Sequence, residues 1–262
     1  MSEAALTDRP AAGQQVRVQL CGRFAFVVDG RPLHPQLPGR RGRLLLAYLA
    51  AHRTSPIPRE QVLDALWDVP ARSASASLNV LLSRVRALIA PAGVDGRSTL
   101  QLVVPAGSVI DVDAAMAALH QAESANAQRN WRRAWPAALT ALMVARRGFL
   151  TEYDEAWIVP WRAQIDLMYE RALGCYAEAC LGIGGTELPG AERAARRLID
   201  RAPLSETGYR LLMEVLAASG DIAAALAVYE RLRRTVRDEL GIDPGPAAQQ
   251  VYRGLLRAAS ER

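Results

Sequence analysis

Hydrophobic periodicity changes character once along the chain, and this change constrains the fold more than any other feature. Up to about residue 110, short stretches with hydrophobic residues at every second position alternate with stretches at helical spacing. Beyond that point the strand pattern disappears, and alanine-rich helical periods continue nearly to the C-terminus. The 262 residues also suit two ordinary domains better than one large one. The pattern predicts a disordered lead-in at 1–14, a mixed domain over 15–112 and an all-α domain over 113–262.

The predicted strands of the first domain lie at its two ends. Residues 16–20 and 23–28 are strand-like, and Asp29-Gly30 is a dipeptide typical of tight hairpin turns. Near the other end, residues 99–104 and 108–112 are also strand-like and are joined by a Pro-Ala-Gly turn. We expect a small antiparallel sheet from the first pair and a separate hairpin from the second.

Three helices are predicted between these strands. Helical spacing indicates a first helix over 41–52, and a second that buries hydrophobic residues from Val62 to Trp67. Prolines break the pattern between them, and Pro58 suits the first turn of the second helix. The third helix is predicted from about 73 to 90. The element order is therefore two strands, three helices and a hairpin.

The third predicted helix has a hydrophobic face and a basic one. At about 100° per residue, the hydrophobic residues from Leu78 to Ile89 gather into one stripe. The opposite face is small, polar or basic, and no acidic residue occurs over 71–90. Short side chains between longer ones let a helix approach base edges in the major groove. Val80 is unusual on a solvated face, but it would suit the methyl group of thymine.

The basic charge is confined to the first part of the chain. All 32 basic residues are arginine, and the net charge is +5. Residues 1–110 hold 13 Arg against 7 acidic residues, a net of +6, whereas residues 111–262 hold 19 against 20, a net of −1. A basic excess in one domain is expected of a nucleic-acid binder, and arginine can contact phosphate or guanine with two hydrogen bonds at once.

Residues 77–88, which read SLNVLLSRVRAL, resemble the recognition helix of OmpR-type winged-helix domains. The sequence DALW at 64–67 is similar to the end of the second helix of that family, and the leading strand pair matches it too. The resemblance implies a winged helix-turn-helix domain over 15–112 whose third helix enters the major groove of double-stranded DNA.

Specific side chains follow from that resemblance. Those implied to face the bases are Asn79, Val80, Ser83 and Arg84, with Ser75 at the edge of the same face. Those implied to lie near phosphates are Arg40, Arg41, Arg43, Arg72, Arg86 and Arg97. The residues by themselves leave a plainer interpretation open, in which these arginines are solvated cations or surface ion-pair partners.

The second domain is predicted to consist of tetratricopeptide-like helical repeats. Helix-turn-helix segments around Ala134, Ala194 and Ala225 are spaced by multiples of roughly 30 residues, close to the tetratricopeptide period. The stretches 225–230 and 238–246 resemble the bacterial transcriptional activator domain, as do Gly148-Phe149-Leu150, Trp157 and Trp161. Within the second stretch, three residues have predicted roles at a helix end, a helix cap and a first turn: Gly241, Asp243 and Pro246.

Together the two domains are similar to small members of the actinobacterial antibiotic-regulatory (SARP) activators. The resemblance implies a fold that is mainly α with a small β component. It also implies an activator that binds direct repeats of double-stranded DNA near promoters as two protomers. Such a protein would recruit RNA polymerase through its sigma or alpha subunit and would be cytoplasmic and nucleoid-associated, with no membrane partner.

No catalytic, cofactor or metal site is predicted. Metal-ligand spacing is absent from the three cysteines, which we expect to be buried or reduced thiols: Cys21, Cys175 and Cys180. The absence of lysine excludes a Walker A loop. No hydrophobic run approaches the ~20 residues that cross a bilayer. One acidic cluster has no nucleophile or base beside it and is expected to be a solvated face: Glu152, Asp154 and Glu155.

Two rival interpretations remain open at this stage. A helical-repeat adaptor or ligand-sensing protein could use its winged helix for protein contacts, in which case the outer face of residues 72–86 would be apolar or mixed in charge. A DNA-binding repressor would share the same interface without a polymerase contact. An enzyme is not expected.

Overall fold

The computed structural model describes residues 15–67 and 71–260. For residues 71–73 it describes the backbone but not the side chains. The predicted lead-in at 1–14 lies outside the described residues. Two compact units are present: Met1–Ala114 with Arg147–Arg162, and Ala115–Arg146 with Ala163–Arg262. The predicted fold class is confirmed, since a mainly helical chain carries a small β component in its first unit.

A four-stranded sheet opens the first unit, in the order β3-β2-β1-β7. β1 (Val16–Gln19) and β2 (Ala25–Val28) pair antiparallel, with Val18 opposite Phe26, and β3 (Arg31–Pro32) continues the sheet. The connecting Asp29 and Gly30 both have positive φ, as the predicted tight turn requires. Because alternate residues face the same side, one face of the sheet is buried: Val16, Val18, Phe26 and Val28.

Three helices follow the sheet and carry the predicted hydrophobic stripes. They are α1 (Gly39–Ala51), α2 (Arg59–Leu66) and α3 (Ala71–Leu88). α2 begins directly after Pro58, and α3 ends two residues before Ala90, which precedes a proline and is therefore disfavoured in a helix. The stripe of α3 is buried against the rest of the unit: Leu78, Leu81, Leu82 and Val85.

The wing hairpin is built from different strands than the spacing predicts. The predicted partners were 99–104 and 108–112, but β6 (Thr99–Val103) pairs antiparallel with β5 (Gly93–Asp95), a segment for which no strand was predicted. β7 (Val109–Ile110) instead joins the first sheet, parallel to β1. A short β4 (Ile57–Pro58) completes the order β4-β6-β5. The prediction was wrong because an alternating pattern marks a strand without marking its partner.

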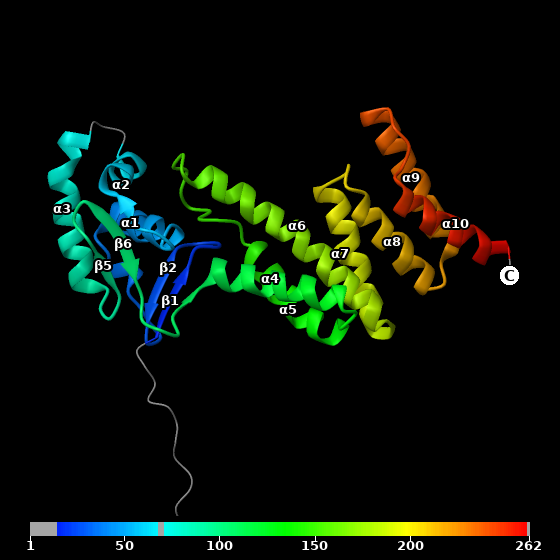
Figure 1. Cartoon of the computed structure of the whole chain (residues 1–262), viewed down its shortest axis with the longest axis horizontal. Coiled ribbons are helices and arrows are strands. Elements are labelled where there is room, and N and C mark those ends of the chain that lie inside the picture. Colours follow the sequence, from blue (N-terminus) through cyan, green and yellow to red (C-terminus); the bar gives the residue numbers. More distant parts are fainter. Residues whose placement is uncertain (1–14, 68–70, 261–262) are drawn as a thin grey trace, which may run out of the picture. The chain divides into compact units, whose positions relative to one another are not determined.

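In Figure 1 this hairpin lies beside α3 within the first unit. Its tip contains Gly96, Arg97 and Ser98, and Gly96 has a φ of +94°. A Cβ on Gly96 would collide with the carbonyl oxygen of Thr99, so the tight tip depends on glycine at this position.

Helices account for the second unit. They are α4 (Asp111–Ala127, which starts in the first unit), α5 (Trp131–Ala145), α6 (Ile158–Ile183, which also starts there), α7 (Leu188–Arg201), α8 (Glu206–Ala218), α9 (Ile222–Leu240) and α10 (Pro246–Ser260). A short 3-10 turn, Gly185–Glu187, separates α6 from α7. None of the helices within residues 15–67 and 71–260 combines the length and hydrophobicity that a bilayer span requires.

Small residues let neighbouring helices of the second unit approach closely. Alanines pack together between α4 and α5, and a Cβ on Gly208 of α8 would lie 2.9 Å from the Ile199 side chain of α7. Asn130 and Asp221 cap α5 and α9, accepting from the backbone N–H of Arg133 and Ala224. α7 packs against α8, and α8 against α9, as expected of a tetratricopeptide-like repeat; these helices are coloured yellow to orange in Figure 1.

Two of the three predicted end signals near residue 241 hold. Gly241 ends α9 in the left-handed conformation, and Pro246 opens α10. The prediction that Asp243 caps α10 was wrong, because that helix starts three residues later. The Asp243 carboxylate instead accepts from Arg237 Nη2 at 2.7 Å.

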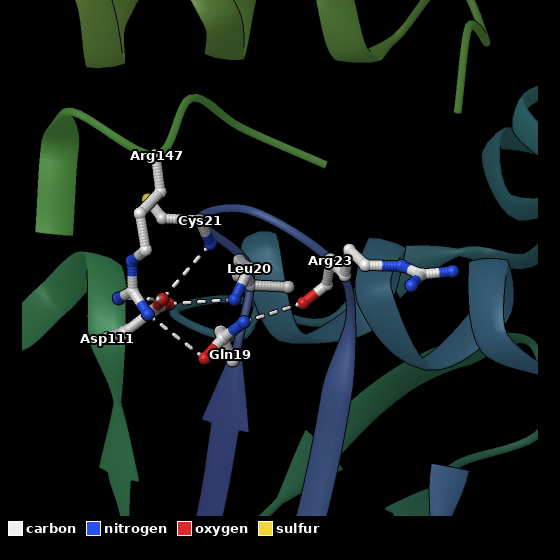
Figure 2. A network of polar contacts seen from close by, with 6 residues as sticks. All are labelled: Gln19, Leu20, Cys21, Arg23, Asp111 and Arg147. Atoms are coloured by element: carbon white, nitrogen blue, oxygen red, sulfur yellow. Dashed lines mark hydrogen bonds and ion pairs between the residues drawn. The ribbon is translucent and has the colours of Figure 1, made fainter. Parts of the chain in front are cut away.

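The segment Arg147–Arg162 packs in the first unit, although its sequence neighbours on both sides belong to the second. Its backbone joins the end of β1: Gly22 N donates to Gly148 O at 2.6 Å, and Leu150 N donates to Leu20 O at 2.9 Å. Asp111 stabilises this junction (Figure 2). Its carboxylate accepts hydrogen bonds from Leu20 N at 2.8 Å, Cys21 N at 3.0 Å and Arg147 Nη2 at 3.2 Å.

Burial raises the pKa of Asp111 above its ordinary value, although the hydrogen bonds from Leu20 and Cys21 and the charge of Arg147 act in the opposite direction. The network continues outward, because Arg147 Nη1 donates to Gln19 Oε1 at 3.0 Å and Gln19 Nε2 donates to Arg23 O at 2.8 Å (Figure 2). These contacts therefore attach a distant part of the chain to the end of β1.

Candidate nucleic-acid interface

The outer face of α3 brings together the side chains that the sequence assigns to base contact. Asn79, Ser83 and Arg84 are exposed, and Val80 is 54% exposed. Leu78, which belongs to the hydrophobic stripe on the opposite face of the helix, is fully buried. Ser75 is half-buried one turn earlier. Arg72 lies in the first turn of α3, and its side chain is outside the described residues. The face is thus solvent-accessible, free of acids and not covered by the residues of the first unit that the structure describes.

A groove of about 570 Å³ runs between this face and the start of α1. Its lining includes Pro38, Trp67 and Val80, with Arg41 and Arg84 as its charged members. The guanidinium of Arg41 lies over the Trp67 ring, 5.3 Å from the centroid, which holds the cation at the rim. Neither Arg41 nor Arg84 has an ion-pair partner among the described residues. The groove therefore combines an apolar floor with two cations available to an external anion.

Three of the other predicted phosphate contacts already have partners within the first unit. Arg40 Nη1 lies 2.5 Å from Glu155 Oε1, and Arg43 Nε donates to the Tyr153 hydroxyl at 3.2 Å. Arg86 donates from Nε to Val94 O at 2.7 Å and from Nη2 to Gly96 O at 2.9 Å. Arg40 and Arg43 thus hold the 147–162 segment, and Arg86 attaches α3 to the wing hairpin.

Arg97, the last of these residues, is exposed in the wing tip. It follows Gly96, whose carbonyl is held by Arg86, so a hydrogen bond from α3 fixes the base of the tip. No ion pair to Arg97 occurs among residues 15–67 and 71–260. The wing tip therefore carries an exposed arginine that has no ion-pair partner among the described residues.

Arg59 is a residue of this surface that sequence reasoning missed. Its Nη2 donates to Asn79 Oδ1 at 2.7 Å and lies 3.4 Å from Ser75 O, while its backbone N donates to Ser98 O at 2.9 Å. It thus connects the start of α2 to both α3 and the wing. One signal could have revealed it: a cation in the first turn of a helix is unfavourable to the helix dipole, so another contact must favour arginine there.

The acidic cluster at 152–155 has hydrogen-bond and ion-pair partners within the first unit. Glu152 accepts from Phe24 N at 3.1 Å, Asp154 pairs with Arg162 and Glu155 pairs with Arg40. The part of the chain that is described contains no group of three or more His, Cys, Asp or Glu placed to hold a metal ion. Burial raises the pKa of Cys21 and Cys175 to about 12 and that of Cys180 to about 11, so these free thiols stay protonated at neutral pH.

Family models match both parts of the chain. The model described as the bacterial transcriptional activator domain matches residues 110–256, and that described as transcriptional regulatory protein, C terminal, matches residues 38–107. The first match alone covers more than half of the chain.

Curated relatives and one solved structure agree with these matches. Transcriptional regulatory protein EmbR of Mycobacterium tuberculosis is 27% identical over 91% of this chain and 62% of its own length. Regulatory protein AfsR of Streptomyces coelicolor is 29% identical over 88% of this chain and 23% of its own. MoaR1 of Mycobacterium tuberculosis, a transcriptional regulatory protein, is 25% identical over 92% and 79%.

The solved structure is Mycobacterium tuberculosis EmbR in complex with a low affinity phosphopeptide. It superposes with a TM-score of 0.79 at 24% identity, over 94% of this chain and 66% of that one. At this identity the likeness concerns the fold. The chain thus spans about two thirds or less of the length of the EmbR and AfsR proteins it matches. The matched families and relatives are named as transcriptional regulators and not as enzymes.

Proposed function

The chain belongs to the family of the bacterial transcriptional activator domain and is similar to the SARP-type regulators EmbR and AfsR, and from that premise we propose that it binds double-stranded DNA sequence-specifically to regulate transcription. The recognition face of α3 enters the major groove, with Asn79, Val80, Ser83 and Arg84 toward the bases and Ser75 at its edge. Phosphate contacts come from Arg41 and Arg97, and from Arg72, with Arg40, Arg43 and Arg86 adding positive charge nearby.

The observation that carries this proposal is the acid-free exposed face of α3 flanked by unpaired arginines. Its long hydrophobic neighbours are buried, so Val80 is exposed by position and not by poor packing. An adaptor surface for protein would be expected to be apolar or mixed in charge, whereas an anionic duplex favours a face with cations only. The groove beside Val80 and Trp67 offers apolar contact for a thymine methyl group next to Arg84.

Assembly and output belong to the same proposal. Two protomers bind neighbouring half-sites about one helical turn apart on one face of the duplex. The helical second unit provides surface for a contact with RNA polymerase, through its sigma or alpha subunit, that recruits the enzyme to the promoter. Reporter output distinguishes this activator from a repressor that shares the DNA interface.

Salt titration of binding tests the proposal directly. The probe is a fluorescent duplex carrying the DNA upstream of the protein's own gene, and fluorescence anisotropy gives the affinity. Each phosphate neutralised contributes roughly −0.9 to the log–log slope, so about four contacts predict a loss of about two orders of magnitude between about 50 and 200 mM salt. An affinity that is flat across this range, or no binding to any duplex in a randomised pool, would refute DNA binding.

A further inference from the structure

The contact between Arg59 and Asn79 determines which atoms of the Asn79 amide can meet a base. At 2.7 Å, the partner of Arg59 Nη2 must be the amide oxygen, because a guanidinium only donates hydrogen bonds and the amide nitrogen does not accept them. The orientation of the amide group is therefore assigned by chemistry. Its oxygen faces α2 and the guanidinium, and its NH2 group is left for another partner.

The neighbouring charge changes what Asn79 can recognise. An unrestrained asparagine contacts adenine with two hydrogen bonds, accepting from the N6 amino group and donating to N7. Here the oxygen already accepts a charge-assisted hydrogen bond, and the adjacent cation repels a second donor such as an amino group. Donation from the Asn79 NH2 group is not opposed in this way, and it is strengthened because the amide is polarised.

Resting on the DNA-binding function above, we propose that Arg59 is a positioning residue that makes Asn79 a donor-only reader of the major groove. The base it selects is guanine, whose N7 and O6 are both acceptors, in place of adenine. Arg59 is well placed for this task, since its backbone N–H is hydrogen-bonded to Ser98 O of the wing turn and its side chain reaches across to α3. Arg59 thus connects the wing turn, α2 and α3.

In vitro selection from a randomised duplex pool tests this inference. Comparing the wild-type protein with Asn79→Ala identifies the base-pair position that depends on Asn79. We expect guanine at that position for the wild type. We expect Arg59→Met, which keeps the aliphatic stem and the backbone hydrogen bond, to raise the ratio of adenine to guanine there by about tenfold, because a matched bidentate contact discriminates between bases by about fivefold to a hundredfold.

Two further variants separate positioning from charge. Arg59→Lys keeps a donor-only cation opposite the amide oxygen and should retain the preference for guanine. Arg31→Met removes one cation from β3, away from α3 in the sequence, and should change affinity slightly and base preference not at all.

The outcomes that overturn the inference are distinct from those that refute DNA binding. Wild-type selection of adenine at the Asn79-dependent position overturns it, and this comparison needs no Arg59 variant. An unchanged base preference in a folded Arg59→Met protein also overturns it, as does an Asn79→Ala protein that selects the wild-type sequence. If the wild type enriches no sequence at all, the proposed function itself fails.

Discussion

The ion-paired arginines of the second unit and the arginines beside the outer face of α3 differ in what surrounds them. Among the described residues, six arginines of the second unit pair with acids of the same unit: Arg171 with Glu123, Arg196 with Glu192, Arg201 with Asp166, Arg210 with Glu214, Arg233 with Glu230 and Arg237 with Asp243. At the α3 face, Arg41 and Arg84 have no such partner among the described residues. The same residue type therefore forms surface ion pairs at these six positions, whereas Arg41 and Arg84 are available to an external anion.

Within the first unit the same contrast recurs on a smaller scale. Arg40, Arg43 and Arg147 hold the segment 147–162 against β1 and α1. Cations with partners thus attach a distant stretch of chain to the winged helix, and cations without partners face outward. The difference teaches that net charge identifies the domain, whereas pairing separates the arginines of the first unit that hold the fold together from those beside the outer face of α3.

Arg84→Ala is expected to have the largest effect. It should weaken binding to the selected duplex by about fivefold to 150-fold, or ~1–3 kcal/mol, and relax the preference at one base position, because the proposed contact of its guanidinium with a base is lost. Quantitative gel shift on matched and mismatched duplexes measures both.

Arg196→Ala is the matched control for that change. It removes one exposed arginine that is paired within its own helix, so binding should stay as in the wild type and stability should fall by at most about 0.5 kcal/mol. If the two variants lose equal affinity, the contrast between the units is broken.

Asp111→Ala should have the next largest effect, and on stability. Removing the carboxylate leaves the buried Leu20 and Cys21 amides without their acceptor, so the free energy of unfolding should fall by about 1–2 kcal/mol. Urea denaturation followed by circular dichroism measures it. Asp113→Ala, at an exposed carboxylate paired with Arg53, should change stability by less than about 1 kcal/mol. Equal losses in the two variants would contradict the role given to the junction.

Thiol reactivity should show the smallest effect. Burial, and after it the Asp111 carboxylate, raise the pKa of Cys21 to about 12, so this thiol should react far more slowly with iodoacetamide at about pH 8 than it does in urea. Because the folded pKa exceeds the ordinary value of 9.0, the stability linked to this group is complete below pH 9 and is lost as the pH rises toward 12. Rapid native labelling of Cys21 would show that the junction opens.

Several elements could be predicted from sequence because their signals are local. The stripe from Leu78 to Ile89 identified α3 within two residues at each end, and Asp29-Gly30 identified the first hairpin. The strand at 99–103 was also recognised, but its partner was not, since strand pairing depends on which segment the rest of the fold brings alongside.

The candidate site likewise has one part that the sequence predicts and one that it does not. Exposure of Asn79, Val80, Ser83 and Arg84 follows from helical spacing, which is readable in the sequence. The partners of Arg40, Arg43, Arg59 and Arg86 are between 8 and 115 positions away along the chain, and no periodicity specifies such contacts. The packing of 147–162 in the first unit is of the same kind.

The amino-acid sequence by itself determined the two-part organisation, the helix α3 and the sign of its exposed face, because periodicity and charge act over a few neighbouring residues. Only the tertiary structure decided which arginines are already paired, which strands form the wing and which way the Asn79 amide points. Those outcomes depend on short-range forces between side chains that are distant in the chain, and a hydrogen bond forms only where folding brings donor and acceptor to within about 3 Å.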